Sequence, residues 1–362
     1  MIKTLKRKLT AACTCCMEPF AATGVSRRSL LTGASALGLA ATGFAPKVFA
    51  QAKPHRIDVH HHIMPPTWIA AMDVVGRTDF LMRNWSVQKT LEDMDKGGVA
   101  TSMTSITLPQ VGSIGKDVAV RVARESNEYA KKMMADHPNR FGVWAMLPLP
   151  HIDESLKEIA HALDTLKLDG IGCLTSYGNR WLGNPHFAPV WEELNRRKAT
   201  VYTHPSSPSC CSNLVQDVPD FVVEYGADTT RTIASLILSG TSQKYKDINW
   251  IWSHGGGALT SFAYRLQHQV LGLPQFRGKL TLETMNAELR RFYYDTAAIP
   301  GAVTVTALKE LVPITQIVYG TDFPYGSAAY TSQGVAGAFK GDDLKKVDRE
   351  NAERLVPRLK GA

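Results

Sequence analysis

The chain of 362 residues is long enough for one large barrel or two ordinary domains, and its apolar content of 44% is that of a globular protein. Its formal charge of +8 lies mainly in the first 50 residues, which hold seven Lys or Arg and one Glu; subtraction leaves 34 bases and 32 acids, a net charge of +2, for the rest. The chain therefore has no electrostatic footprint for binding DNA or RNA.

The first 50 residues have the pattern of a twin-arginine export signal. Arg27 and Arg28 stand in the run SRRSLL, a weakly apolar Gly/Ala/Leu stretch follows, and Val48-Phe49-Ala50 offers small residues for cleavage after Ala50. The alternative is a membrane anchor, but the stretch is short and Gly-rich for crossing ~30 Å of hydrocarbon. We therefore expect residues 1–50 to be cleaved, and the protein to be periplasmic without a stable membrane anchor.

From Arg56 onward, short β-rich runs alternate with helical patterns. Strands are expected near residues 56–62, 99–107, 140–147, 169–175, 200–204, 248–254, 292–297 and 314–322. Helices are expected, among others, at residues 118–135, 153–166, 187–197 and 229–238. This alternation predicts an α/β fold of the (β/α)8 TIM-barrel type, as one catalytic domain over residues 55–360. A doubly wound open sheet is the alternative, but no Gly-rich phosphate turn follows the first strand.

Two stretches between these elements are expected to be irregular. Residues 67–90, which include Trp68, Arg77, Arg83 and Trp85, form a long loop expected to cover the active site, and residues 205–223 follow the fifth strand. A final helix at residues 348–358 is expected on the outside of the barrel.

Three cysteines follow the leader, namely Cys173, Cys210 and Cys211. Cys173 pairs with Cys210 or Cys211 in an oxidising compartment, or all three stay free thiols, and the sequence leaves these alternatives open.

Polar side chains recur where the predicted strands end. The first strand ends in His60 and His62, which share one strand face, the fifth in His204, the sixth in His254 and the eighth in Asp322. The C-terminal ends of barrel strands converge on one mouth. Any one of these residues alone has a purely structural explanation. Their joint placement favours a divalent ion of the zinc or manganese type.

These motifs resemble those of the amidohydrolase superfamily, and within it the aminocarboxymuconate-semialdehyde decarboxylase branch with its 6-methylsalicylate decarboxylase-like proteins. The resemblance covers about residues 55–360 and is carried by the runs DVHHH, THP, WSHGGG and GTDFP. It implies that His60, His62, His204 and Asp322 hold the metal, that His254 acts as general acid/base, and that Asp322 also takes part in catalysis. Because residues 170–176 lack the bridging Lys or acid of two-metal members, we expect one ion, zinc first and manganese as the alternative.

The resemblance implies non-oxidative decarboxylation of a small aromatic or unsaturated carboxylic acid. The alternative is hydrolysis of a lactone, amide or C–C bond at the same metal. A third possibility is a non-catalytic periplasmic metal or carboxylate binder, although such a binder has no need of His254.

Arginine suits the binding of a substrate carboxylate because its guanidinium forms two parallel hydrogen bonds. Arg265 matches a branch arginine that enters the neighbouring site across a dimer interface, which implies a homodimer. The pattern departs at Gln267, where the branch usually has Asp. Arg83 and Arg77 are further candidates for this role.

Overall fold

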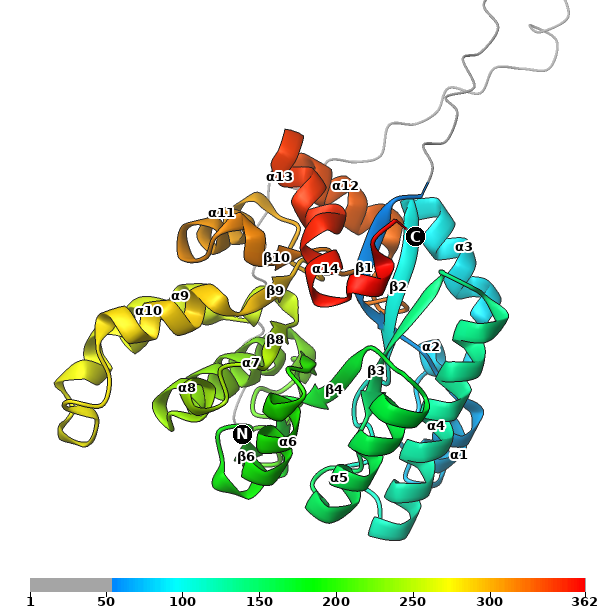
Figure 1. Ribbon diagram of the computed structural model, residues 1–362, viewed down its shortest axis with the longest axis horizontal. Helices are drawn as coiled ribbons and strands as arrows, with labels where there is room; N and C mark the ends of the chain where they lie inside the picture. Colours follow the sequence, from blue (N-terminus) through cyan, green and yellow to red (C-terminus); the bar gives the residue numbers. More distant parts are fainter. Residues whose placement is uncertain (1–53, 362) are drawn as a thin grey trace, which may run out of the picture. The chain divides into compact units, whose positions relative to one another are not determined.

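Eight parallel strands form the main sheet of this computed structural model, which describes residues 54–361 (Figure 1). In sheet order they are β1 (Arg56–His62), β2 (Val99–Ser105), β3 (Phe141–Met146), β4 (Gly170–Leu174), β7 (Thr200–His204), β8 (Asn249–Trp252), β9 (Tyr293–Asp295) and β10 (Ile317–Val318). A backbone hydrogen bond from Val59 to Tyr319 and a bridge between His61 and Phe323 connect the last strand region to the first. The sheet is therefore a nearly closed barrel, and the predicted fold class is confirmed. The expected leader, residues 1–50, lies outside the described residues.

The last strand is shorter than expected. Residues 314–316 form a 3-10 turn after Pro313, and only Ile317–Val318 pair with β9. The chain then follows β1 through single hydrogen bonds, such as the one from the Asp322 amide to the His60 carbonyl at 2.8 Å. Asp322 itself has a positive φ of 66°, so the strand pattern ends there.

Helices alternate with the strands around the barrel. They are α1 (Pro66–Val74), α2 (Phe80–Arg83), α3 (Val87–Gly97), α4 (Lys116–Asp136), α5 (Ile152–Ala160), α6 (Ala188–Arg196), α7 (Asp220–Leu238), α8 (Thr241–Lys244), α9 (Leu259–Tyr264), α10 (Leu282–Arg291), α11 (Ala302–Leu311), α12 (Ala328–Ala338), α13 (Gly341–Lys345) and α14 (Asn351–Leu355). A small hairpin, β5 (Ser176–Tyr177) with β6 (Arg180–Trp181), follows β4. Within residues 54–361, no helix combines the length and the apolar character needed to cross a membrane.

The expectation of one long loop over residues 67–90 is wrong, because short helices occupy most of it. Asp79 caps α2 by accepting a hydrogen bond from the Met82 amide, and Ser86 caps α3 by accepting one from the Lys89 amide. These caps satisfy amide groups that helix ends leave unpaired, which stabilises helices as short as α2. The irregular stretch after β7 is also shorter than expected, because α7 begins at Asp220.

The final helix lies elsewhere than expected. Instead of packing on the outside, α14 and the turn after it join the same buried cluster as strand residues inside the barrel, and the members of that cluster from this segment are Ala352, Leu355, Val356 and Leu359. The carbonyl of Leu355 accepts a hydrogen bond from Thr200, the first residue of β7. The segment therefore closes the barrel at the N-terminal ends of the strands.

The three described cysteines are free. Cys173 is buried in β4, whereas Cys210 is exposed and Cys211 is half-buried in the stretch after β7. No bridge joins Cys173 to either of them.

Candidate metal centre and active site

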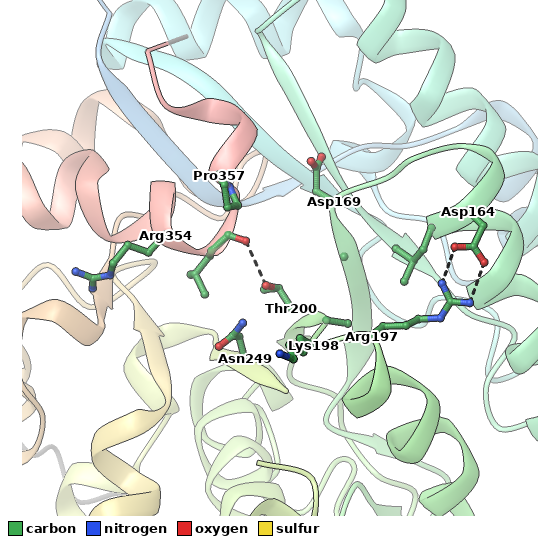
Figure 2. Close-up of a pocket in the computed structure, with 12 residues that line it drawn as sticks. Asp164, Asp169, Arg197, Lys198, Thr200, Asn249, Arg354 and Pro357 are labelled. Carbon is green, nitrogen blue, oxygen red and sulfur yellow. Dashed lines mark hydrogen bonds and ion pairs between the residues drawn. The ribbon is translucent and has the colours of Figure 1, made fainter. Parts of the chain in front are cut away.

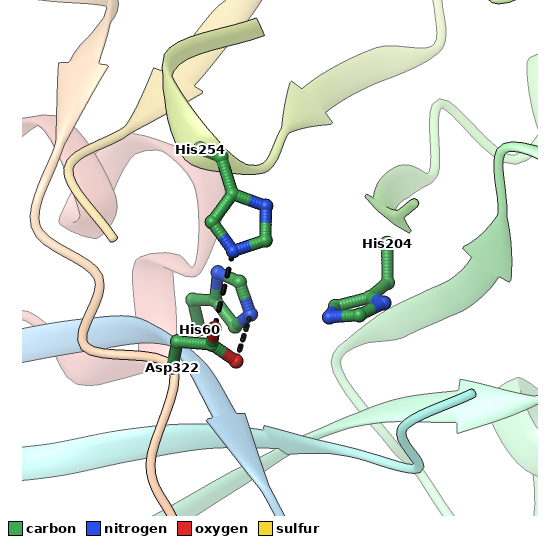
Figure 3. Close-up of side chains that lie close together, drawn as sticks. All are labelled: His60, His204, His254 and Asp322. Atoms are coloured by element: carbon green, nitrogen blue, oxygen red, sulfur yellow. Dashed lines mark hydrogen bonds and ion pairs between the residues drawn. The ribbon is translucent and has the colours of Figure 1, made fainter. Parts of the chain in front are cut away.

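The predicted metal ligands converge with His254 at the C-terminal ends of the strands, and Figure 3 shows four of these side chains, His60, His204, His254 and Asp322. The Nε2 atoms of His60 and His62 are 3.2 Å apart, and each is 3.1 Å from Oδ1 of Asp322. Nε2 of His254 lies 3.2 Å from the other carboxylate oxygen of Asp322. One donor atom each from His60, His204, His254 and Asp322 lie within 4.8 Å of one another. The strand ends thus bring together the residues that the sequence pattern singled out.

A buried carboxylate, Asp58, fixes the local shape of β1. Its oxygens accept hydrogen bonds from the backbone amides of His60 and Thr321, both at 3.0 Å, and from Nδ1 of His61 at 3.1 Å. His61 therefore turns away from the centre and stacks on Phe323, with ring centroids 4.7 Å apart. The prediction that His61 points away from the metal ligands is confirmed.

Each of three histidines is held by a partner at its Nδ1 atom. Nδ1 of His60 donates to Asp295 at 2.8 Å, and Nδ1 of His204 donates to the carbonyl of the following residue at 2.9 Å. Nδ1 of His62 lies 3.1 Å from the Ser105 hydroxyl. Because a carboxylate or carbonyl oxygen only accepts, the rings of His60 and His204 hold their proton on Nδ1. Nε2 of each ring is then the atom directed into the centre, the arrangement usual for metal-binding histidine.

The donor atoms fit a divalent cation. Two imidazole nitrogens lie 3.2 Å apart and a carboxylate oxygen lies 3.1 Å from both, so three potential ligand atoms face one small space, where a cation can take the place of protons as their shared partner. Imidazole nitrogens with one carboxylate are a donor set typical of zinc and related transition metals. The described residues therefore contain a metal-binding site.

Burial and the neighbouring charges set the protonation of this centre. Burial lowers the pKa of His62 to about 4, and burial with the neighbouring imidazoles lowers that of His204 well below its usual value. Burial would also lower the pKa of His60, but Asp295 and Asp322 outweigh it and raise the pKa to about 10. Burial would raise the pKa of Asp322, yet the charge on His60 and hydrogen bonds from three histidines hold it well below the usual range. The centre thus offers an ionised carboxylate at Asp322 and neutral imidazoles at His62 and His204, whereas His60 carries a proton that a bound cation must displace.

His254 differs from the other histidines in its surroundings. Its backbone amide donates to Oδ1 of Asp295 at 2.8 Å, and its φ of 52° turns the chain sharply after β8. Its Nδ1 is buried and has no hydrogen-bond partner among the described residues. Its side chain is 15% exposed, whereas those of His60 and His62 are fully buried. Only one of its ring nitrogens is therefore engaged, which leaves this ring free to exchange a proton.

Asp295 is a site residue that the sequence analysis missed. It ends β9 with its side chain fully buried, and its two oxygens hold the His60 ring, the His254 amide and the Ala297 amide. The sequence pattern used for the other site residues also applies to Asp295, because this residue lies near the end of the seventh predicted strand, in the run FYYDTA. A carboxylate in this position orients two members of the centre at once.

The three predicted substrate-binding arginines lie outside the cluster. Arg83 ends α2 and forms an exposed ion pair with Asp73 at 2.5 Å, and Arg77 is exposed in the turn between α1 and α2. Arg265 follows α9 and is also exposed. Within residues 54–361, none of them forms a hydrogen bond or an ion pair with a metal-binding residue. Their role in substrate binding stays a prediction.

Aromatic side chains border the centre. The ring of Tyr225 on α7 lies 6.2 Å from that of His204, and the ring of Tyr325 lies 6.2 Å from that of His62. The Tyr325 hydroxyl donates to Asp79, the residue that caps α2, at 3.1 Å. The segment of residues 67–90 therefore reaches the surroundings of the site through this contact, although its form differs from the loop expected.

A separate hollow of about 420 Å³ lies at the other end of the barrel (Figure 2). Its lining includes Thr200 and Asn249, the first residues of β7 and β8, and Pro357 after α14. Because the metal-binding residues lie at the opposite strand ends, this hollow does not belong to the candidate active site.

The chain is similar to a known protein family and to several known proteins. A family model described as "Amidohydrolase" matches residues 57–358. Decarboxylase yanB of Aspergillus niger is 34% identical, covering 84% of this chain and 88% of the relative, and a 6-methylsalicylic acid decarboxylase of Penicillium expansum is 33% identical, covering 84% and 97%. A solved dihydroxybenzoic acid decarboxylase from a Polaromonas species, with bound manganese and the inhibitor 2-nitroresorcinol, has a TM-score of 0.72 at 20% identity, covering 85% and 98%.

Proposed function

The chain belongs to the amidohydrolase family, and from this premise we propose that it is a metal-dependent, non-oxidative decarboxylase of a small aromatic carboxylic acid. The observation that carries the proposal is the cluster of imidazoles and one carboxylate at the strand ends, in a chain whose curated relatives are named decarboxylases. The relatives' names also favour an aromatic substrate over an unsaturated aliphatic one.

In this proposal His60, His62, His204 and Asp322 hold one divalent ion. The Nδ1 partners of His60 and His204 support these two assignments, because an acceptor at Nδ1 leaves Nε2 to bind the metal. His62 is included because its Nε2 lies 3.2 Å from that of His60 and 3.1 Å from Oδ1 of Asp322. Zinc suits this donor set, and the manganese bound to the Polaromonas relative makes manganese the alternative. When bound, the ion supplies a Lewis acid that polarises a substrate carboxylate and an adjacent oxygen.

His254 is assigned the proton transfer. Its Nε2 faces Asp322 at 3.2 Å, and its Nδ1 has no partner among the described residues, whereas Nδ1 of His60 and of His204 is held by an acceptor oxygen. The protonated imidazole gives its proton to the ring carbon that bears the carboxylate. The carbon–carbon bond then breaks, its electron pair restores the aromatic ring, and CO₂ leaves. His254 regains a proton from water.

The neighbouring tyrosines suit an aromatic substrate. Tyr225 and Tyr325 approach the centre from α7 and from the turn after Asp322, and their rings offer flat apolar surfaces at its border. The substrate carboxylate also needs a positively charged side chain to bind it. We propose Arg265 of a second copy of the chain for this role, with the protein acting as a homodimer. Arg83 and Arg77 are the alternatives.

Localisation forms a second part of the proposal. Arg27 and Arg28 support export through the twin-arginine pathway with cleavage after Ala50, which places the enzyme in the periplasm. A variant with both arginines changed to lysine is expected to stay uncleaved in the cytoplasm, and normal periplasmic delivery of that variant would exclude the pathway.

The function is tested by CO₂ release from a panel of phenolic acids that includes 6-methylsalicylate and dihydroxybenzoates, beside a panel of esters and lactones. The metal-loaded protein is expected to release CO₂ from at least one acid, and chelator-treated protein is the matched control. Hydrolysis of an ester or lactone without CO₂ release from any acid would contradict the proposal.

A further inference from the structure

The stretch between β7 and α7 carries two adjacent thiols, Cys210 and Cys211, whose sulfur atoms lie 2.7 Å apart. Neither the decarboxylation mechanism nor the metal-binding cluster uses them. The backbone amide of Cys211 donates to the carbonyl of Pro208 at 2.8 Å, so both residues belong to one tight turn. This turn holds the two side chains together on the same side of the chain.

The turn is anchored on both sides. Before it, the Ser206 hydroxyl lies 2.7 Å from that of Ser176 and donates to buried Asp228 at 3.3 Å. After it, the Ser212 hydroxyl and the Asn213 amide donate to Asp220, at 2.9 and 2.8 Å. The backbone of the thiol pair is therefore fixed on both sides. Along the chain, the anchoring residue Ser206 lies between His204 and the two cysteines.

The two sulfurs differ in their access to solvent. Cys210 is exposed, and Cys211 is half-buried. The pKa of Cys211 is raised, chiefly by its hydrogen bond to Cys210, and the nearby Arg231 charge opposes this only in part. Cys211 therefore keeps its proton longer, and exposed Cys210 is the thiol that a small disulfide reaches first.

Cys173 lacks these features. It is buried in β4, and burial raises the pKa of its thiol to about 12. It is therefore unreactive and serves as an internal control.

We propose that Cys210 and Cys211 form a reversible redox site, in which a small-molecule disulfide oxidises the pair to a disulfide between adjacent residues. The Cys210 thiolate attacks the small disulfide, forms a mixed disulfide and releases one small thiolate. The Cys211 sulfur then loses its proton to water, attacks the sulfur of Cys210 and expels the second small thiol. The two protein thiols lose two electrons and two protons in total, and one small disulfide becomes two small thiols.

The bond is expected to be easily reduced. Adjacent Cα atoms are about 3.8 Å apart, closer than the roughly 4.4–6.8 Å usual between paired cysteines. Strained and exposed disulfides are the labile ones. The site would thus respond to the surrounding thiol–disulfide balance and does not depend on the proposed decarboxylase activity.

The sequence allows a direct test by peptide mapping. Trypsin is expected to release residues 199–231 as one peptide that contains both Cys210 and Cys211, whereas Cys173 falls in residues 168–180. The full-length, metal-loaded protein is treated with oxidised glutathione, denatured, alkylated and digested. The peptide 199–231 should then be unalkylated and lighter by two hydrogen atoms, while the Cys173 peptide is fully alkylated. Dithiothreitol should restore both thiols.

Matched variants separate the steps. Cys211→Ser should stop at one glutathione bound to Cys210, and Cys173→Ser should close the bond like the parent. Both thiols remaining alkylatable after treatment, each thiol carrying its own glutathione, or a bond from either to Cys173 would overturn the proposal.

Discussion

Replacing Asp295 by Asn isolates the carboxylate that orients the metal centre. The variant keeps one oxygen for the amides of His254 and Ala297, but its NH₂ group then faces Nδ1 of His60, which also carries a hydrogen. Two donors at 2.8 Å repel, so a neutral His60 ring must carry its proton on Nε2, the atom directed at the metal, and not on Nδ1.

The size of the effect follows from this geometry. The contact is a charge-assisted hydrogen bond between two fully buried side chains, so water cannot replace it. Loss of such a supporting partner typically lowers metal affinity about 10–100-fold. Because the tautomer itself is reversed here, we expect the upper end, ~100-fold or about 2.7 kcal/mol.

The assay is a competition titration of the metal-free protein against a chromogenic chelator. Asp169→Asn is the matched control, because Asp169 is a buried carboxylate near the other end of the barrel, where it accepts hydrogen bonds from Arg358 and the Val143 amide. It should bind metal like the parent even if it is less stable. An Asp295→Asn protein with the parent's metal affinity would refute the reasoning.

Three further results are expected. In the metal-free protein the raised His60 pKa of about 10 keeps that ring protonated at neutral pH, so metal binding must displace a proton. Metal affinity should therefore rise about tenfold per pH unit between pH 7 and 9. Calorimetry in two buffers of different ionisation enthalpy measures the proton release, and metal binding without proton release would contradict this prediction. Gly97→Ala places a Cβ 2.3 Å from that of Ala328 and should lower the free energy of unfolding, measured by urea denaturation, by about 1–3 kcal/mol. The control Gly337→Ala adds its Cβ in open space on α12 and should not lower this free energy. Equal stability of the two variants would disprove the packing argument. Arg265→Ala should raise KM at unchanged metal content, and mixing it with His254→Ala chains should restore some activity through mixed dimers; a fully active monomer would exclude this role.

The sequence predicted the barrel and most of its mouth because both depend on local patterns. Alternation of strands and helices implies the barrel, and a polar residue at a strand end is thereby placed at the mouth, as His204 and Asp322 were. His60 and His62 followed from the two-residue period of a strand. No long-range information was needed for any of these.

What the sequence left undetermined depends on tertiary contacts. Asp295 stood at the correct strand end, but its role follows from a hydrogen bond to His60, 235 positions away. The apolar residues of the last helix indicate a buried face without indicating which surface covers it, and α14 closes the barrel instead of packing outside. Short helices such as α2 depend on caps that a count of apolar residues does not detect.

The central claim is the division of roles between His254 and the metal ligands, and one measurement tests it most directly. Metal content and CO₂ release are determined side by side for the parent, His254→Ala and His62→Ala, with an acid that the parent decarboxylates. We predict that His254→Ala retains about one ion per chain and loses at least ~10²-fold in rate, whereas His62→Ala loses the ion as well. A His254→Ala protein that loses its metal, or a His62→Ala protein that keeps it, would contradict the account.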